Sequence, residues 1–300
     1  MSSGRILCIG ECMVELAPTG DGTYRQGFAG DTFNMAWYLR RLMPAEWQVD
    51  YLTAVGDDAM SGRMMEFMRQ SGIGTDCVTG RKGGAPGLYL ISVLDGERSF
   101  FYWRGQSAAR TLAQDRAALE RAFASTQALV FSGITLAILP EADRRFLLAA
   151  LKAARGMGSQ VVFDPNLRPR LWQSSDEMRA ATTEAAAIAD LVLPSFDDER
   201  AAFGDVSPSA TAERYERLGA GEVVVKNGAG GIHWRNQRGA GGHWHPPRAA
   251  LIVDTTAAGD SFNAAYLYAR FSGADPAAAI VQASGVAAKV IAVRGALVPL

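Results

Sequence analysis

The second half of the chain alternates between segments with helical hydrophobic spacing and short apolar runs. From about residue 108 onward, each amphipathic segment is followed by a run of apolar and β-branched residues. Strands separated by helices are typical of right-handed βαβ units, so this pattern predicts a mainly parallel sheet with helices on both faces. The predicted helices span residues 115–123, 140–157, 176–189 and 210–218, and the strands that follow them span 128–131, 160–163, 191–193 and 222–225.

The first half of the chain predicts further strands and helices of the same α/β fold. Residues 5–10 form a short apolar run next to a glycine, which favours a buried strand. A helix is expected to open at residues 29–34 and to continue through Leu39. Residues 50–55 then predict a strand, and residues 61–71 predict a helix.

Residues 87–104 have a different pattern, with β-prone and aromatic residues on both sides of Asp95-Gly96. This pattern is typical of a β-hairpin. The alternation around Glu11 and Glu15 indicates a half-exposed strand in the early part of the chain. We therefore expect this hairpin and the early strands to form a small sheet that stands off the main one.

Composition narrows the class of protein. The chain has 300 residues, of which 48% are hydrophobic and 20% are charged, and this suits a single domain over residues 1–300. The net charge of −1 offers no basic field for nucleic acid or for an anionic membrane. No apolar stretch reaches the roughly 18–20 residues of a membrane helix, and the N-terminus lacks the pattern of a signal peptide. Three sparse cysteines predict free thiols and a cytoplasmic location.

One segment near the C-terminus combines an apolar run, small residues and two acids. Residues 249–253 predict a strand, residues 257–259 a tight turn, and the residues from Phe262 onward a helix. Small side chains let backbone N–H groups approach an anion at a helix N-terminus, where the peptide dipoles also favour negative charge. Asp260 would face that anion, as a general base does in phosphoryl transfer. The alternative is that Asp254 or Asp260 only caps the helix.

Polar residues directly follow several predicted strands, and in parallel sheets ligands bind beyond the carboxyl ends of the strands. Arg168 and Arg170 follow one strand, and Arg104 lies on the hairpin beside Tyr102. Arginine matches carboxylate or phosphate oxygens in a bidentate geometry, so two arginines directed at one substrate favour an acidic sugar. The alternatives are that Arg168 and Arg170 pair with surface acids and that Arg104 lies on an exposed face of the hairpin. The strand-end segments are residues 164–168, 194–198, 226–228 and 254–260.

The segment Asp254-Thr255-Thr256-Ala257-Ala258-Gly259-Asp260 resembles the C-terminal signature of the ribokinase-like carbohydrate kinases, the phosphofructokinase B family. This resemblance implies an α/β fold with a lid over the sugar site, here roughly residues 12–27 and 87–106, that often serves as a dimerisation surface. Residues 30–34, 102–110, 164–172 and 193–199 resemble the 2-keto-3-deoxygluconate kinase branch. The implied reaction is ATP-dependent phosphorylation of the sugar acid to its 6-phosphate by a homodimer.

The resemblance also implies roles for individual residues. Asp260 is the expected general base, and Ala257, Ala258 and Gly259 are the expected anion hole. The residues expected at the sugar acid are Gly30, Asp31, Asn34, Tyr89, Tyr102, Arg104, Arg168 and Asp260. The residues expected along ATP are Asn166, Lys226, Gly228, Gly231, Ala258, Gly259, Ser284 and Ala288.

Two cations are implied in the same way. Mg²⁺ would be held through water by Asp198, although this stretch departs from the family pattern Asn-x-x-Glu, because Ser195 and Asp198 occupy its two ends. A monovalent cation such as K⁺ would be held by Asp254 and Thr256, with backbone near residues 290, 293 and 295.

Two other functions compete with this interpretation. One is a kinase of the same fold for a neutral sugar, such as fructose or ribose, or for a nucleoside. The other is a regulator that binds a sugar or a nucleotide without catalysis. The intact segment from Asp254 to Asp260 argues against the regulator, because a pure binding protein has little use for a base placed at an anion site.

Overall fold

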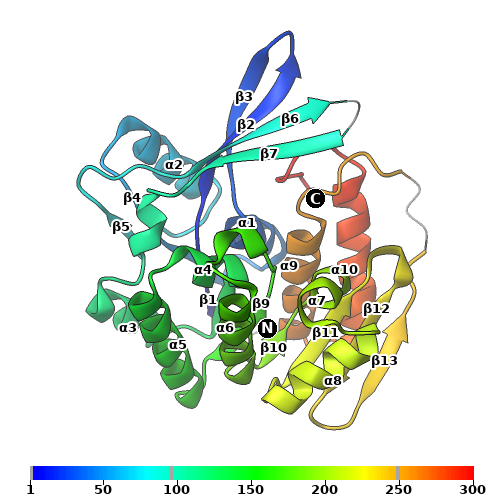
Figure 1. The fold of residues 1–300 in the computed structure, drawn as a ribbon. Helices are drawn as coiled ribbons and strands as arrows, with labels where there is room; N and C mark the ends of the chain where they lie inside the picture. The colour runs from blue at the N-terminus through cyan, green and yellow to red at the C-terminus, as the bar shows by residue number, and fades with distance from the viewer. Residues whose placement is uncertain (1–2, 95–96, 248–250) are drawn as a thin grey trace.

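The centre of the molecule is a nine-stranded sheet with the order β13-β12-β11-β10-β9-β8-β1-β4-β5, seen in a computed structural model that describes residues 3–94, 97–247 and 251–300 (Figure 1). Within this order, the neighbouring strands β11, β10, β9, β8, β1, β4 and β5 all pair in parallel, which confirms the mainly parallel sheet. Strands β12 and β13 form an antiparallel edge, and β12 runs antiparallel to β11 because the turn Gly228–Gly230 between them is too short for a parallel crossover. The strands are β1 (Arg5–Ile9), β4 (Gln48–Val55), β5 (Val78–Gly80), β8 (Ala128–Ser132), β9 (Gln160–Asp164), β10 (Leu191–Val192), β11 (Glu222–Lys226), β12 (Ile232–Asn236) and β13 (Gly241–Trp244).

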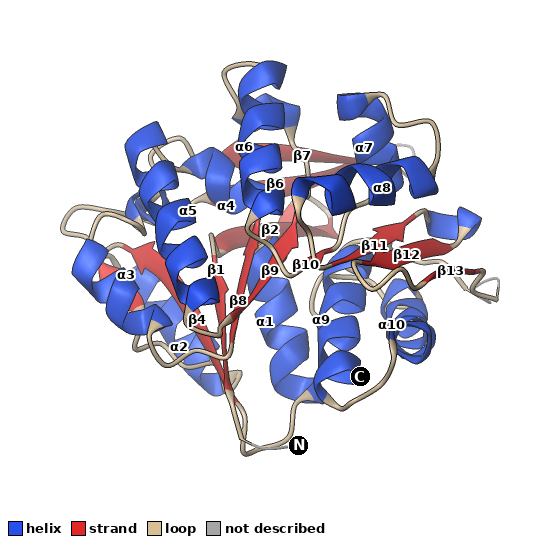
Figure 2. Ribbon diagram, turned by 90° about the horizontal axis from the view of Figure 1, so that it is seen from below, coloured by secondary structure: helices blue, strands red, loops and turns tan. Residues whose placement is uncertain are grey.

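Helices cover both faces of this sheet, with α1, α9 and α10 on one face and α5, α6 and α8 on the other (Figure 2). Alternate residues of each strand point to opposite faces, so the sheet has two cores: Ile6 and Cys8 belong to one, and Leu7 and Ile9 to the other. No helix among the described residues is long and apolar enough to cross a membrane. The α-helices are α1 (Asp31–Leu42), α2 (Ala59–Gln70), α3 (Arg116–Phe123), α4 (Gly133–Ile138), α5 (Glu141–Gly156), α6 (Ser175–Ala187), α7 (Phe196–Phe203), α8 (Pro208–Leu218), α9 (Ala258–Phe271) and α10 (Pro276–Ile291); the 3₁₀ turns are η1 (Ala108–Thr111), η2 (Pro169–Leu171) and η3 (Gly228–Gly230).

A second sheet of four strands, here called the small sheet, stands above the carboxyl ends of the main strands (Figure 1). The predicted hairpin is confirmed as β6 paired with β7, while its turn, Asp95-Gly96, lies outside the described residues. One face of the small sheet buries Met13, Tyr89 and Ile91. The small sheet has the order β3-β2-β6-β7, with β2 (Met13–Gly20), β3 (Thr23–Ala29), β6 (Leu88–Leu94) and β7 (Glu97–Trp103).

A strand was predicted over residues 249–253, of which Ala249 and Ala250 lie outside the described residues. For the described part of this run the prediction is wrong. Leu251, Ile252 and Val253 form no strand and are 57%, 63% and 46% exposed. The backbone amide of Val253 instead donates to the carbonyl of Ile291, at the end of α10. An apolar run becomes a strand only where a neighbouring strand can pair with it, and the main sheet already ends at β13.

Candidate functional site

The N-terminus of α9 is open, because no side chain caps it. Its N-cap residue Ala257 has a left-handed φ of 57°, which costs an alanine roughly 1 kcal/mol. The amides of Gly259 and Asp260 donate no hydrogen bond to any residue that the structure describes, whereas the amide of Ala258 donates to the carbonyl of Thr255 at 3.2 Å. Unpaired N–H groups at a helix N-terminus attract anions. The capping alternative for Asp260 is therefore wrong, and the turn is free to hold an anion.

Five residues predicted from separate parts of the sequence meet around this turn. Asn34 Nδ2 of α1 donates to Asp260 Oδ2 at 2.7 Å, and the backbone amide of Gly30 donates to Asn34 Oδ1 at 3.3 Å. Asp31, in the first turn of α1, accepts a hydrogen bond of 2.8 Å from Asn166 Nδ2 beyond β9. The fold thus places two carboxylates and two carboxamides at the carboxyl ends of the parallel strands, as the rule for such sheets requires.

Asp164 and Asn263 complete the site and were not predicted as site residues. Asn263 Nδ2 donates to Asp164 Oδ2 at 2.7 Å and Asn263 Oδ1 accepts from Lys226 Nζ at 2.9 Å. Lys226 Nζ also lies 3.8 Å from Asp164 Oδ2 and 3.8 Å from where a Cβ of Gly259 would stand. This ammonium group therefore lies directly beside the open turn. The sequence held signals for both residues, because Asp164 directly follows the strand predicted over residues 160–163 and Asn263 follows Asp260 by about one helical turn.

Asp260 has the protonation behaviour of a base that works near neutral pH. Burial and, after it, the charges of Asp31 and Asp164 raise the pKa of Asp260, while Asn34 and Lys226 lower it, and the net result is a pKa of about 8. Burial also raises the pKa of Asp164. A general base is most effective when its pKa is close to the working pH. The environment of Asp260 therefore fits proton acceptance from a substrate hydroxyl.

The same pKa predicts that the free protein loses stability as the pH rises through about 8. Between 3.8, the ordinary pKa of the side chain, and about 8, folded Asp260 holds a proton that the unfolded chain has released. The free energy of unfolding then falls with rising pH, because the folded state binds more protons than the unfolded state. Asp260→Asn cannot ionise, so its melting temperature should exceed that of the native protein at about pH 9 and by less at about pH 6. A melting-temperature difference that does not grow with pH would contradict this pKa.

Glycines beyond β11 leave room for a nucleotide. Gly228 and Gly231 have left-handed φ values of 48° and 93°, and no described atom lies within 4 Å of where a Cβ of Gly228 would stand. On α10, which packs against β13, the hydroxyl of Ser284 is buried without a partner among the described residues, and Ala288 is exposed one turn later. An open glycine turn and an unused hydroxyl fit the predicted ATP side of the site.

The small sheet contributes a second group of polar residues. Tyr89 of β6 donates a short hydrogen bond from its hydroxyl to Glu15 of β2, and the ring of Tyr102 lies 5.9 Å from that of Tyr89. Arg104, just beyond β7, forms a close ion pair with Glu11. The strand predicted here is confirmed as β2, but its expected half-exposure is wrong at the two glutamates, because Glu11 and Glu15 are buried, 1% and 8% exposed. Their charges can be buried because an arginine and a tyrosine hydroxyl bind them.

Arg168 lies beyond β9 with half of its side chain exposed, and its Nη1 is 3.4 Å from Asp198 Oδ2 in the first turn of α7. Burial raises the pKa of Asp198, although Arg168 acts against the shift. The structure describes no contact between Arg168 and Arg104; each has an acid partner of its own. Within the described part of the chain, no group of three or more His, Cys, Asp or Glu residues is arranged to hold a metal ion. A single carboxylate such as that of Asp198 is enough for a Mg²⁺ ion that keeps most of its water and binds phosphate oxygens.

Asp254 and Thr256, the expected ligands of a monovalent cation, are bound by an arginine. Arg98 of β7 donates from Nη1 to Asp254 Oδ1 in a close ion pair and to Thr256 Oγ1 at 2.9 Å. The second carboxylate oxygen is also taken, since the backbone amide of Gly295 donates a hydrogen bond to Asp254 Oδ2 at 2.7 Å. These side chains do not fit a potassium ion, because a positive group already occupies their oxygens.

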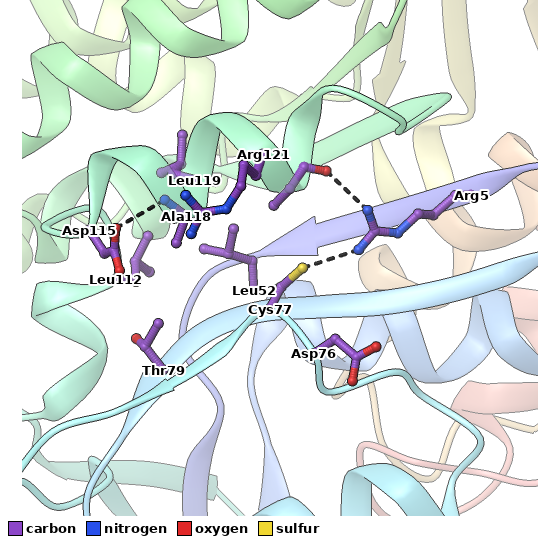
Figure 3. A pocket seen from close by; sticks show the side chains of 11 residues that line it. Arg5, Leu52, Asp76, Cys77, Thr79, Leu112, Asp115, Ala118, Leu119 and Arg121 are labelled. Carbon is purple, nitrogen blue, oxygen red and sulfur yellow. Dashed lines mark hydrogen bonds between the residues drawn. The ribbon is translucent and has the colours of Figure 1, made fainter.

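A separate cavity of about 270 Å³ lies on the flank of the main sheet, lined by residues of β1, β4, β5 and α3 (Figure 3). Arg5, the first residue of β1, points into it and donates to Cys77 Sγ and to the carbonyl of Ala122, both at 3.1 Å. Ligands of parallel sheets bind beyond the carboxyl ends of the strands, not beside the amino ends. This cavity is therefore not the candidate site.

Comparisons with known proteins show which family this chain matches. Residues 3–300 match the pfkB family carbohydrate kinases. The 2-dehydro-3-deoxygluconokinase of Dickeya dadantii is 39% identical, over 100% of this chain and 98% of its own, and that of Haemophilus influenzae is 37% identical, over 98% and 95%. The crystal structure of a PfkB protein from Polaromonas sp. JS666 superposes with a TM-score of 0.85 at 27% identity, over 96% of both chains. The chain belongs to the pfkB family of carbohydrate kinases.

Proposed function

We propose that the protein transfers the γ-phosphoryl group of ATP to the C6 hydroxyl of 2-keto-3-deoxygluconate, also called 2-dehydro-3-deoxygluconate. The observation that carries this proposal is the placement of Asp260. Its carboxylate, with a pKa of about 8, lies at the uncapped N-terminus of α9, beside unpaired amides and the ammonium group of Lys226. The two relatives described above, at 39% and 37% identity, carry the name of this activity.

The residues of the site divide the work of the reaction. Asp260 accepts the proton of the C6 hydroxyl while that oxygen bonds to the γ-phosphorus, and the bond to the bridging oxygen breaks so that ADP leaves with its electron pair. The amide of Gly259 and the ammonium group of Lys226 stabilise the charge on the transferring group. Mg²⁺, when bound, neutralises charge on the β- and γ-phosphates, and Asp198 would hold it through water. Asn34 orients the base by its hydrogen bond of 2.7 Å.

The sugar acid would lie between α1 and the small sheet, which then acts as a lid. Arg104 and Arg168 would bind the substrate carboxylate, and the hydroxyl groups of Tyr89 and Tyr102 would face the sugar. Arg104 is well suited to this task, because its side chain is only 10% exposed and its Nε is buried without a partner among the described residues. A buried donor without a partner is unfavourable unless a ligand satisfies it.

The experiment that tests this function is ATP consumption by the purified protein with a panel of acceptors. The panel contains 2-keto-3-deoxygluconate, its galactonate-derived epimer, fructose, ribose and adenosine. We expect turnover with the keto-deoxy acids only. Preference for fructose, ribose or adenosine would retain Asp260 as the base and reject the carboxylate pocket. Turnover with none of them would favour a non-catalytic binding protein.

A homodimer that forms through the small sheet remains a prediction, supported by aromatic side chains on β7. Phe101 and Trp103 are 53% and 61% exposed, and they lie on the face opposite Tyr102, because successive strand residues alternate. Exposed aromatic clusters are common at protein interfaces. A cytoplasmic location is likewise proposed, in keeping with three cysteines that are all free thiols.

A further inference from the structure

Arg98 links the small sheet to the loop that carries the anion-binding turn. It belongs to β7, where its backbone pairs with Val93 of β6, and its guanidinium group contacts residues more than 150 positions later in the chain. The side chain of Arg98 is 25% exposed, and that of Asp254 only 2%. This ion pair is therefore mostly shielded from solvent, which makes its strength less sensitive to salt than that of a surface pair.

Asp254 is the point at which three segments meet. Its Oδ1 accepts from Arg98 and from the amide of Thr256 at 3.0 Å, and its Oδ2 accepts from the amide of Gly295 at 2.7 Å. Its own amide donates to the carbonyl of Ile291 at 3.1 Å. Although burial opposes ionisation, the hydrogen bonds from Arg98, Thr256 and Gly295 lower the pKa of Asp254 to about 2. The carboxylate is thus charged, buried and balanced by one arginine.

The position of Asp254 in the chain gives this ion pair a role in the reaction. Two residues after it, Thr256 is held by the same guanidinium group at 2.9 Å, and the next residue is the left-handed N-cap Ala257. The open amides of α9 begin directly beyond this point. A left-handed alanine persists only when its surroundings hold it in place, and the Arg98 contacts are part of those surroundings.

We propose that Arg98 is a positioning residue whose guanidinium group serves as the built-in cation of the Asp254 loop. It neutralises Asp254, holds Thr256 and so fixes the anion-binding turn, and it ties this turn to the small sheet. A monovalent metal ion is not needed there, because a second positive charge at the same oxygens would be repelled by the first. This inference rests on the proposed kinase activity and concerns how that activity is supported.

The test begins with the native protein, whose turnover of 2-keto-3-deoxygluconate is measured in sodium and in potassium buffers of equal ionic strength. Turnover in sodium buffer establishes the proposed function independently of this inference. We expect kcat to be the same in both buffers. A native protein that requires potassium would overturn the inference, whatever its variants do.

The second step compares Arg98→Ala with Arg98→Lys and with Arg25→Ala. Arg25, on β3 of the same sheet, is exposed and forms no ion pair with a described residue, so it controls for loss of one positive charge. We expect Arg98→Ala to lower kcat by up to about 100-fold, the scale of a small misplacement of catalytic groups. Arg98→Lys and Arg25→Ala should stay close to the native rate.

Rescue by small cations separates a cation role from simple attachment of the sheet. Millimolar guanidinium chloride or potassium chloride should restore much of the kcat of Arg98→Ala, whereas sodium chloride should not. The same salts should leave the kcat of Arg25→Ala unchanged. Native-like turnover of Arg98→Ala in sodium buffer would overturn the inference. So would a loss of turnover that no cation relieves and that Arg98→Lys shares.

Discussion

Replacement of Asp260 by asparagine should lower kcat by about 100- to 10,000-fold, the usual contribution of a general base. The substituted side chain keeps an oxygen that can accept the hydrogen bond from Asn34, so the site keeps its shape and KM for both substrates should change little. Steady-state kinetics over a range of pH measure this directly. The native protein should gain kcat/KM as the pH rises towards about 8, where Asp260 loses its proton, and Asp260→Asn should lack this rise.

Asp31→Asn is the matched control for Asp260→Asn. It removes a carboxylate of the same cluster, whose charge helps to raise the pKa of Asp260, but leaves the proposed base in place. The rise of kcat with pH should therefore move to lower pH while much of kcat remains, and KM for the sugar acid should increase, because Asp31 is itself expected to contact the substrate. If Asp31→Asn and Asp260→Asn lost kcat equally, the loss would come from the charge of the cluster and not from a single proton acceptor.

Neutralisation of Arg168 should be the second large effect. We expect Arg168→Gln to lower kcat/KM for 2-keto-3-deoxygluconate by about 30- to 150-fold, which corresponds to roughly 2–3 kcal/mol for a charged hydrogen-bonded partner. The estimate lies at the low end of the usual range because the side chain is 50% exposed. Any weak turnover of fructose should stay the same, since fructose has no carboxylate. Kinetics with both sugars provide the comparison.

Arg170→Gln controls for the change of charge at the same loop. Arg170 belongs to η2, two residues beyond Arg168, and is exposed without an ion pair to a described residue. Its replacement should leave both sugars unaffected. An equal loss in Arg168→Gln for the acid and for fructose would mean that Arg168 supports the loop or its neighbour Asp198, and not the substrate carboxylate.

Local patterns were sufficient for the main fold. The four helices and four strands predicted between residues 115 and 225 occur within two residues of their predicted bounds, because each carries its own periodicity, whereas the short helices α4 and α7 were not predicted. The run at residues 251–253 has the same apolar character and forms no strand. Pairing with a neighbour decides whether such a run becomes a strand, and a neighbour is a property of the whole fold.

The candidate site, like the fold, was predictable where its residues are close in sequence and unpredictable where they are far apart. Asp260 was found because acid, small residues and helix start are adjacent in sequence, and the strand-end rule pointed to Lys226 and Arg168. Arg98 carried no local signal, since its partners lie more than 150 residues away. Glu11 and Glu15 looked half-exposed because alternation in a strand does not reveal which face a second sheet or an arginine will cover.

The sequence by itself predicted the class of fold, the candidate base and the candidate anion-binding turn, because the residues that indicate each of them are near one another in the chain. Only the tertiary structure decided the charge balance of the site. It set Asp31 and Asp164 near Asp260, which raises the pKa of that base, and it brought Arg98 to Asp254, where a metal ion had been expected. Burial and long-range charge pairs depend on where distant segments come together, and no spacing within the chain encodes them locally.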